Sequence, residues 1–289
     1  MDNIRGAALM VIAMLGFALE DMFIKLLADA LSVGQIIFML GVGGATVFGT
    51  VVLLQGRALF SRDMLILPIL LRAIGEMFGA ITFVSAFVLT SISSASAILQ
   101  ATPLVVTLGA AIFLQEPVGW RRWSAILVGL CGVLLIIRPG MESFSVLSLL
   151  AVAGVLFLAL RDLATRRIPK AISSMQLSFL GFAATIPAGL AMMLAQGRPL
   201  EALNPTGWAY IGAALGIGLF AYYAIVAAMR VGEVSFVTPF RYARLLFALV
   251  VGVVVFNKSP DALTLTGAAI IVASGIYTVW RERRLRVSS

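Results

Sequence analysis

The chain has 289 residues, of which 61% are hydrophobic and 12% charged, and its mean hydropathy is +1.08. Soluble domains are about 45–50% apolar and about 25% charged, so most of this chain is expected to lie in lipid. With no histidine and a single cysteine, Cys131, the sequence excludes a disulfide framework, a cysteine-based metal site and a histidine general base.

Ten hydrophobic runs follow along the chain, each close to the roughly 20 residues that a helix needs to cross the hydrocarbon core. We place the predicted spans at residues 5–27, 33–54, 65–89, 94–114, 121–138, 144–163, 173–196, 207–230, 233–256 and 262–281. The breaks between them are short, and the first run is interpreted as a retained signal-anchor helix. The runs lack two-residue alternation, so the predicted fold is an all-α integral membrane protein with ten transmembrane helices.

The net charge of +8 would suit a nucleic-acid partner, but the positions of the basic residues favour a membrane explanation. With the N-terminus in the cytoplasm, 14 of the 21 Lys and Arg residues fall on the cytoplasmic side and four on the outer side. Three more, Arg72, Arg241 and Arg244, lie within spans. This bias predicts ten spans with both termini in the cytoplasm, against the alternative that the charges are scattered.

The chain contains an internal repeat. Ala18-Leu19-Glu20-Asp21 recurs as Ala159-Leu160-Arg161-Asp162, almost half a chain length later, and the last two spans of each half match at nearly the same offset. We therefore predict a first five-span repeat at 1–140 and a second at 141–289, which form one transport unit. Because five is odd, the second repeat would enter the membrane from the opposite side, as is common in secondary transporters. The alternative is coincidence in a low-complexity apolar sequence.

Three features resemble the EamA-like branch of the drug/metabolite transporter superfamily: the paired five-span repeats, a stretch of spaced Pro, Glu and Gly residues, and a basic tail after Arg281. The stretch comprises Pro103, Glu116-Pro117, Gly129, Gly132 and Arg138. This likeness covers essentially the whole chain, and implies a multi-pass exporter in the bacterial inner membrane. Within the superfamily the chain looks most similar to exporters of aromatic amino acids and methionine. The chain departs from the family pattern in two places. The second repeat has Ser259 where the first has Glu116, and the first span has Leu15-Gly16 where many relatives have Trp-Gly. These departures bear on the identity of the substrate more than on the fold.

Ionisable groups inside spans are the first candidates for function, because each costs about 2.5–3.5 kcal/mol at a helix centre on insertion scales. Arg72 and Glu76 are four residues apart and can pair on one helix face. Gly75, Gly79 and Phe83 lie near the same stripe. We expect either a cavity wall whose charge contacts a substrate, or a structural ion pair between helices.

Arg241 and Arg244 are three residues apart in the ninth predicted span, and need partners from elsewhere. Glu76 and a substrate carboxylate are the candidates, since a carboxylate can make a bidentate contact with a guanidinium group. We expect one or both arginines to line the pathway, with a gate-closing salt bridge as the alternative.

The repeated Glu20-Asp21 and Arg161-Asp162 pairs are expected near opposite faces of the membrane. One interpretation is that these side chains snorkel to the interface, and the other is that they form the outer and inner gates.

Uncharged candidates complete the predicted cavity. Gln100 lies deep in the fourth span, three residues before Pro103, which is expected to free a backbone carbonyl. Tyr222 and Tyr223 would either stack on an aromatic ligand or pack in the core. The small-residue pair Gly212–Gly216 is expected to permit a close helix contact.

Enzymatic functions lack the residues that they require. There is no P-loop for ATP, and the missing histidines exclude an intramembrane zinc protease and a Ser–His dyad. We therefore predict no enzyme activity, no cofactor, no metal and no nucleic-acid partner.

The predicted function is secondary transport by alternating access, with the lipid bilayer and a small amphipathic solute as partners of a monomer. The solute is expected to be an exported aromatic or hydrophobic amino acid. The alternatives are a drug cation, a nucleobase or a sugar derivative, or a receptor or scaffold that transports nothing. Glu20, Asp21 or Glu76 could carry a coupling proton, or transport could be passive.

Overall fold

The computed structural model describes residues 2–113, 115, 120–138, 145–169, 171–197, 200–231 and 238–287, and every regular element within them is a helix. Within this part of the chain, seven segments are long and apolar enough to cross a membrane. They are Ile4–Leu27, Val33–Leu54, Leu67–Leu89, Ser94–Phe113, Ser148–Thr165, Ser174–Ala195 and Pro205–Ile225. The fifth and tenth predicted spans contain shorter apolar helices, Leu127–Ile137 and Ala262–Ser274, so the count of ten spans stays a prediction.

The helix bounds lie within a few residues of most of the predicted spans. In the first half the elements are α1 (Asp2–Leu27), α2 (Val33–Leu54), η1 (Arg62–Met64), α3 (Leu67–Leu89), α4 (Ile92–Leu99), α5 (Thr102–Phe113) and α6 (Trp120–Ile137). In the second half they are α7 (Ser148–Arg166), α8 (Ser174–Ala195), α9 (Pro205–Val231), η2 (Thr238–Tyr242), α11 (Ala243–Val254) and α12 (Ala262–Val287).

The fourth predicted span is broken into two helices, α4 and α5, with a turn at Gln100 and Ala101. Pro103 lies in the first turn of α5, where a missing backbone N–H costs little. The carbonyl that this proline leaves without an i+4 donor is that of Leu99, and it accepts a hydrogen bond from the Thr102 hydroxyl at 2.6 Å. The expected free carbonyl is therefore already bonded, because a neighbouring side chain replaces the lost donor.

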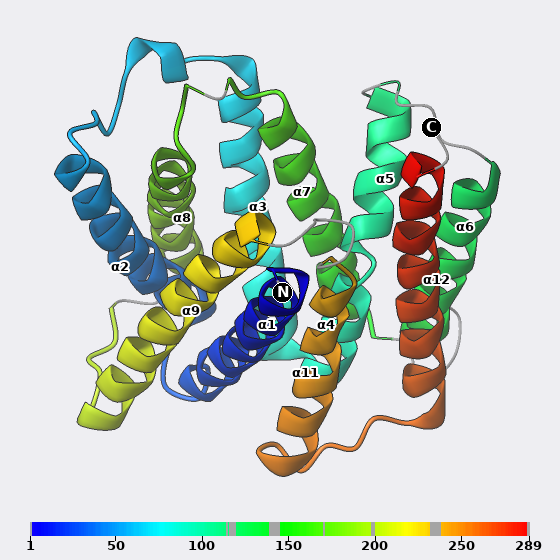
Figure 1. The fold of residues 1–289 in the computed structure, drawn as a ribbon. Coiled ribbons are helices and arrows are strands. Elements are labelled where there is room, and N and C mark those ends of the chain that lie inside the picture. Colours follow the sequence, from blue (N-terminus) through cyan, green and yellow to red (C-terminus); the bar gives the residue numbers. More distant parts are fainter. Residues whose placement is uncertain are drawn as a thin grey trace.

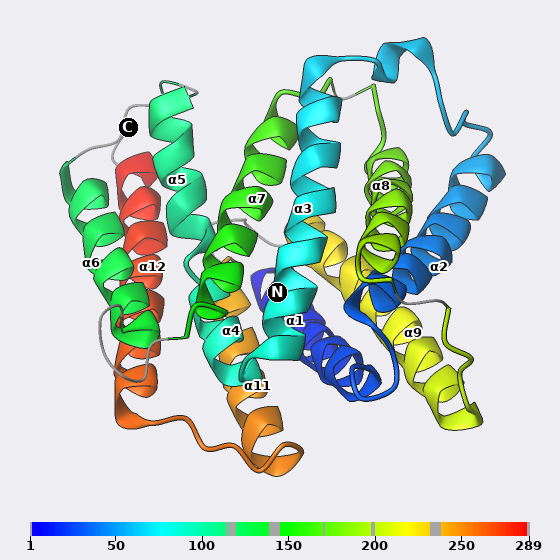
Figure 2. The same cartoon turned by 180° about the vertical axis from the view of Figure 1, so that it is seen from behind.

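The helices run between two edges of the molecule (Figure 1). The connections from α2 to α3 and from α7 to α8 lie at the upper edge, whereas those from α8 to α9 and from α11 to α12 lie at the lower edge. Both views show α6 beside α12 at one end of the molecule, and α2 with α8 at the other (Figures 1 and 2). Each repeat therefore contributes a helix to both ends of the bundle.

The most extensive helix contacts join the two halves of the chain. α1 packs along α9, α2 along α8, α3 along α7, and α6 along α12. Each of these pairs takes one helix from each half. In lipid, such contacts depend on close packing and interhelical hydrogen bonds, because the hydrophobic effect supplies little driving force between apolar helices.

Two Ser-x-x-Gln sequences, at equivalent places in the two repeats, begin α2 and α8. Ser32 and Ser173 cap the helices by accepting hydrogen bonds from the backbone N–H groups of Gln35 and Gln176, each at 3.2 Å. The two glutamine side chains also cross to the other half. The Gln35 amide exchanges hydrogen bonds with the backbone of Glu201 at 2.7 and 3.0 Å, and that of Gln176 donates to the Ala58 carbonyl at 2.9 Å. The same contact thus recurs at opposite edges of the bundle (Figure 1).

Glycines allow two of the cross-half pairs to approach closely. A Cβ on Gly189 of α8 would lie 2.6 Å from the Gly34 carbonyl oxygen of α2, and one on Gly267 of α12 would lie 2.6 Å from the Gly132 oxygen of α6. By contrast, a Cβ on either glycine of the Gly212–Gly216 pair would meet nothing within 4 Å. The predicted close contact at that pair is wrong, because those positions of α9 face open space and not another helix.

The glycine contacts yield a matched test. Gly189→Ala should lower stability by about 1–3 kcal/mol, because the new methyl group overlaps the backbone of α2. Gly212→Ala should leave stability unchanged or raise it by up to about 1 kcal/mol, since alanine favours a helix and the site is open. Thermal unfolding of both variants in detergent checks this. Equal midpoints would contradict the close approach of α2 and α8.

Candidate functional site

Four charged side chains of α3 and α7 form a connected series of ion pairs. The Arg72 and Glu76 side chains pair at 3.1 Å, as their spacing predicts. The other carboxylate oxygen of Glu76 lies 3.3 Å from Arg161, whose guanidinium also contacts Asp162 at 2.8 Å. Arg72 donates a further hydrogen bond to the Leu177 carbonyl of α8 at 3.1 Å. Glu76 therefore links two arginines from opposite halves of the chain.

A second ion pair joins α1 to α11. The Arg244 guanidinium binds both carboxylate oxygens of Asp21, at 2.7 and 2.9 Å, while its cationic centre lies 5.3 Å from the Phe17 ring and 5.4 Å from the Phe83 ring. Contacts of both kinds stabilise a desolvated guanidinium. The expectation that Glu76 is the protein partner of Arg244 is wrong, because the helix packing brings Asp21 to it and commits Glu76 to Arg72 and Arg161.

The snorkelling interpretation fails for Asp21, which is only 1% exposed. Its carboxylate needs no water because Arg244 supplies the opposite charge within the bundle. Arg161 likewise pairs with Asp162 on its own helix and with Glu76 on α3. The alternative, that Glu20-Asp21 and Arg161-Asp162 form the outer and inner gates, stays a prediction.

Arg241 is the exception among the arginines near these pairs. In the part of the chain that the structure describes, no side chain or carbonyl forms a hydrogen bond or ion pair with it. It lies within electrostatic range of Asp162 and Arg161 in one group of ion pairs and of Arg244 in the other. The described residues thus supply no direct counter-charge to Arg241.

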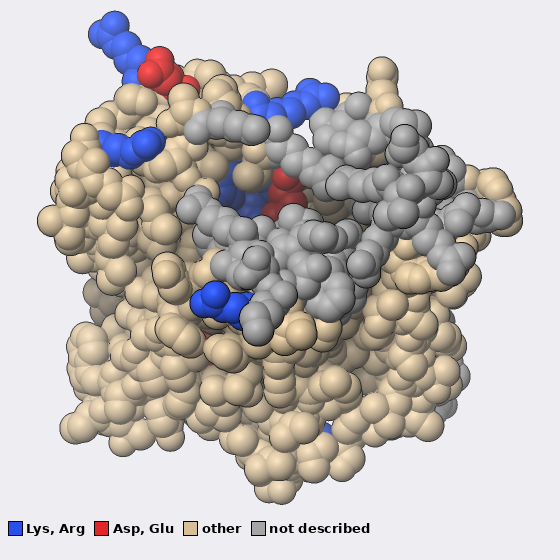
Figure 3. Space-filling view, viewed as in Figure 1, with Lys and Arg blue, Asp and Glu red and all other residues tan. Residues whose placement is uncertain are grey.

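The charged side chains remain partly accessible although they lie on packed helices. Arg161 and Asp162 expose 27% and 32% of their side chains, and Glu76 and Arg244 each expose 23%. Figure 3 shows basic and acidic atoms inside a hollow in the upper part of the face that it presents. An intramembrane charge is tolerated where it is paired or faces a wet cavity, and these side chains are paired and partly accessible.

The uncharged candidates are divided between the centre and the periphery. Phe83 lies beside Arg244, and Gly79 contacts Leu158 of α7, so both belong to the same region as the ion pairs. Gln100 is buried, at 8% exposure, in the break between α4 and α5. The two predicted tyrosines, Tyr222 and Tyr223, lie on α9.

The two tyrosines of α9 do not form a common stacking surface. Tyr222 shares a hydrogen bond with the Ser178 hydroxyl and packs edge-on against Phe48, with ring centroids 5.3 Å apart. Tyr223 is 65% exposed. Adjacent residues of a helix point about 100° apart, so one tyrosine packs against α2 and α8 while the other points away. Core packing is thus the correct interpretation for Tyr222.

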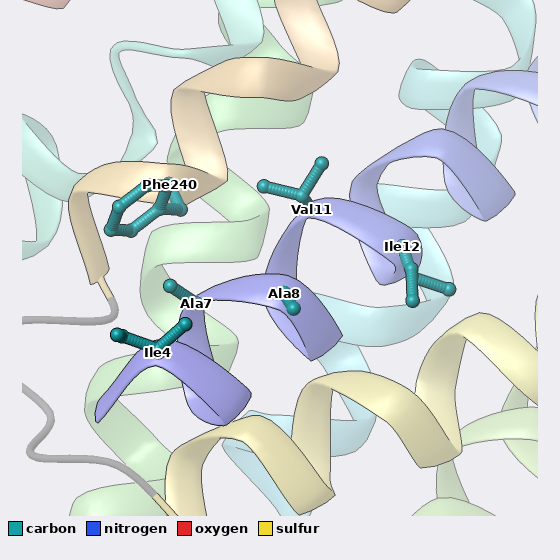
Figure 4. Close-up of a pocket in the computed structure, with 6 residues that line it drawn as sticks. All are labelled: Ile4, Ala7, Ala8, Val11, Ile12 and Phe240. Atoms are coloured by element: carbon teal, nitrogen blue, oxygen red, sulfur yellow. The ribbon is translucent and has the colours of Figure 1, made fainter. Parts of the chain in front are cut away.

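A separate groove of about 500 Å³ lies between the start of α1 and η2 (Figure 4). It is lined by Ile4, Ala7, Ala8, Val11, Ile12 and Phe240, and its walls are almost entirely apolar. Such a surface fits lipid chains and offers no group that would orient a polar solute. We therefore place the candidate site at the two groups of ion pairs, around Glu76–Arg161 and Asp21–Arg244.

Sequence reasoning missed two residues that shape this region. Lys25 donates to the Phe87 and Thr90 carbonyls at 2.6 and 2.5 Å, and so caps the C-terminal end of α3. Gly218 of α9 leaves space for the Glu20 carboxylate. The sequence signal for Lys25 was its place in the last turn of a helix. The signal for Gly218 was that it repeats Gly75 at the offset that relates the last two spans of the two halves.

The Asp21–Arg244 pair can be tested by a double-mutant cycle. Asp21→Asn and Arg244→Gln should each destabilise by about 3–5 kcal/mol, because each leaves one buried charge without its partner. The double variant should lose clearly less than the sum of the two. Thermal unfolding in detergent measures all three, with Arg62→Gln on the exposed η1 as the control. Additive losses would show that the two side chains do not interact.

Three curated relatives of this chain are transporters by name. A riboflavin transporter of Vibrio cholerae is 31% identical over 191 residues, which is 66% of this chain and 63% of the relative. An S-adenosylmethionine uptake transporter of Rickettsia felis is 23% identical over 74% of this chain and 72% of its own. A pseudopaline exporter of Pseudomonas aeruginosa is 23% identical over 94% of each. These names do not support the narrower likeness to exporters of aromatic amino acids.

The fold also matches a known crystal structure at a TM-score of 0.61, with 20% identity over 95% of this chain and 98% of the other. The sequence profile of the EamA-like transporter family matches twice, at residues 4–138 and 146–280. These two matches cover nearly the whole sequence, one in each half. The chain therefore belongs to the EamA-like transporter family, whose members are multi-pass membrane transporters and not enzymes.

Proposed function

We propose that this chain is a secondary transporter of a small amphipathic organic anion or zwitterion, and that Arg241 binds the anionic group of the solute. The observation that carries the proposal is the charge of Arg241, which no direct partner neutralises among the described residues. Arg72, Arg161 and Arg244 each have a carboxylate partner.

A guanidinium within a membrane protein is costly unless a counter-charge approaches it. Asp162 lies within electrostatic range of Arg241 but is already paired with Arg161. A solute carboxylate can supply two parallel hydrogen bonds and the missing negative charge. The solute would thereby be held between the two groups of ion pairs.

An aromatic or hydrophobic amino acid remains the first solute class that we propose. It combines a carboxylate for Arg241 with an apolar side chain, and the Phe17 and Phe83 rings beside Arg244 supply apolar surface. S-adenosylmethionine, named in one relative, also carries an amino-acid carboxylate. One relative is named for uptake and another for export, so the direction of net flux has to be measured from both sides.

The proposed mechanism is alternating access through ten spans in two inverted repeats, with both termini in the cytoplasm. The glutamine contacts of Gln35 and Gln176, which recur at opposite edges, support the inversion. The cross-half pairing of α1 with α9 and of α3 with α7 supports it too, because exchanging the repeats interconverts the two pairs. Binding lowers the barrier for the solute by replacing water with Arg241 and the surrounding rings.

Flux into proteoliposomes tests the proposal. Phenylalanine, tyrosine, methionine and S-adenosylmethionine would be offered to purified protein and to empty vesicles. At least one should enter the protein vesicles faster, and Arg241→Gln should reduce this flux at least tenfold, because a carboxylate loses its charged partner. Arg241→Lys should retain more flux, while Arg62→Gln on the exposed η1 should match the unmodified protein. Full flux in Arg241→Gln would remove this residue from the binding site.

Riboflavin is a second candidate, favoured by the relative of 31% identity. Its ring system is aromatic and uncharged at neutral pH, so its binding would depend on stacking more than on Arg241. Riboflavin flux that is insensitive to Arg241→Gln, with no flux of any carboxylate solute, would favour this candidate over the first.

A further inference from the structure

Glu20 is a carboxylate without a direct cationic partner. Among the described residues it forms no hydrogen bond or ion pair, although the next residue, Asp21, is held by Arg244. Its carboxylate lies against Gly218 of α9, where a Cβ would be 2.5, 2.6 and 2.8 Å from Oε1, Cδ and Oε2. The side chain therefore points into the contact between α1 and α9.

The equivalent place in the other half is fully paired. Arg161 occupies the position of Glu20 in the second copy of the repeat, and its backbone N and Cβ lie against Gly75, whereas Glu20 meets Gly218 with its carboxylate. The residue that follows Gly75 on α3 is Glu76, which pairs with that arginine. The residue that follows Gly218 on α9 is Leu219, which offers no charge.

The charges facing Glu20 do not compensate it. Asp21 on its own helix and Arg244 on α11 are within electrostatic range, and they neutralise each other through a bidentate contact. α9 presents the bare backbone of Gly218, and α3 contributes the Phe83 ring next to Arg244. η2 also packs against α1 and carries the unpaired Arg241, but the groups within electrostatic range of Glu20 are Asp21 and Arg244. An ionised Glu20 would thus hold a negative charge with no direct cationic partner among the described residues, which is unfavourable away from water.

We propose that Glu20 is a proton-binding site that couples solute movement to a proton gradient. This inference rests on the proposed transport function. The carboxylate takes a proton from water when the path to one side is open, and returns it to water on the other side. A proton needs no further space at this carboxylate, which lies against the α9 backbone at Gly218.

Two measurements in proteoliposomes distinguish this inference from the proposed function: net solute flux under a pH gradient, and solute counterflow without one. An imposed pH gradient should raise net flux severalfold in the unmodified protein, and Glu20→Gln should abolish that stimulation. Counterflow requires no net proton movement and should fall far less in the same variant. Asp63→Asn, the same chemical change on the exposed η1, should keep both activities.

Stimulation that persists in Glu20→Gln, or that is absent from the unmodified protein, would overturn the proton site while leaving transport intact. If a cationic solute competes with protons and Glu20→Gln abolishes its counterflow, Glu20 binds solute and the inference is also wrong. If the unmodified protein shows no counterflow of any solute offered, that result would instead count against the proposed function.

Infrared difference spectra provide a measurement that needs no solute. The unmodified protein should show the C=O band of a protonated carboxyl group at neutral pH, and Glu20→Gln should lose it. Glu76→Gln should retain the band, because Glu76 forms ion pairs with two arginines. A band that survives in Glu20→Gln, or that is absent from the unmodified protein at neutral pH, would contradict the inference.

Discussion

Lipid offers neither counter-charges nor hydrogen-bond partners, so the charges of this bundle must find their partners within the protein. The two buried ion-pair groups obey this constraint across the midpoint of the chain: Arg161 binds Glu76, 85 residues earlier, and Arg244 binds Asp21, 223 residues earlier. The main helix contacts cross the midpoint as well. Neither half could therefore satisfy its own charges alone, and the place where the halves meet is also where a solute can find charge.

The sequence predicted what depends on local pattern. Hydropathy located the apolar segments, and the i,i+4 rule predicted the Arg72–Glu76 pair. Partner choice over long distances could not be predicted: the sequence offers Glu76 or a substrate carboxylate as candidates for Arg244, but helix packing places Asp21 there. The different surroundings of Tyr222 and Tyr223 also depend on which neighbours surround α9. By contrast, the repeated Ser-x-x-Gln at Ser32 and Ser173 was present in the sequence and could have been found at the same offset as the Ala-Leu-x-Asp repeat.

Duplication with small changes explains how related positions acquire different roles. Gly75 and Gly218 preserve the close helix contact in both halves, while the adjacent residues differ as Glu76 and Leu219. Together with the difference between Arg161 and Glu20, this change leaves a lone carboxylate in one half where the other half has a connected series of ion pairs. The repeated helix arrangement thus determines where the side chain at an equivalent position projects, while the residue type at that position can differ between the two repeats.

The separation of Asp21 from Arg244 has a consequence for biogenesis. Because a chain is made from its N-terminus, α1 must enter the membrane long before α11 exists, and Asp21 then has no guanidinium to bind. The same holds for Glu76 until α7 is made, apart from its contact with Arg72. Early insertion therefore has to tolerate uncompensated carboxylates, either near the lipid headgroups or within the insertion machinery. Final assembly is completed only when the second half arrives with its arginines.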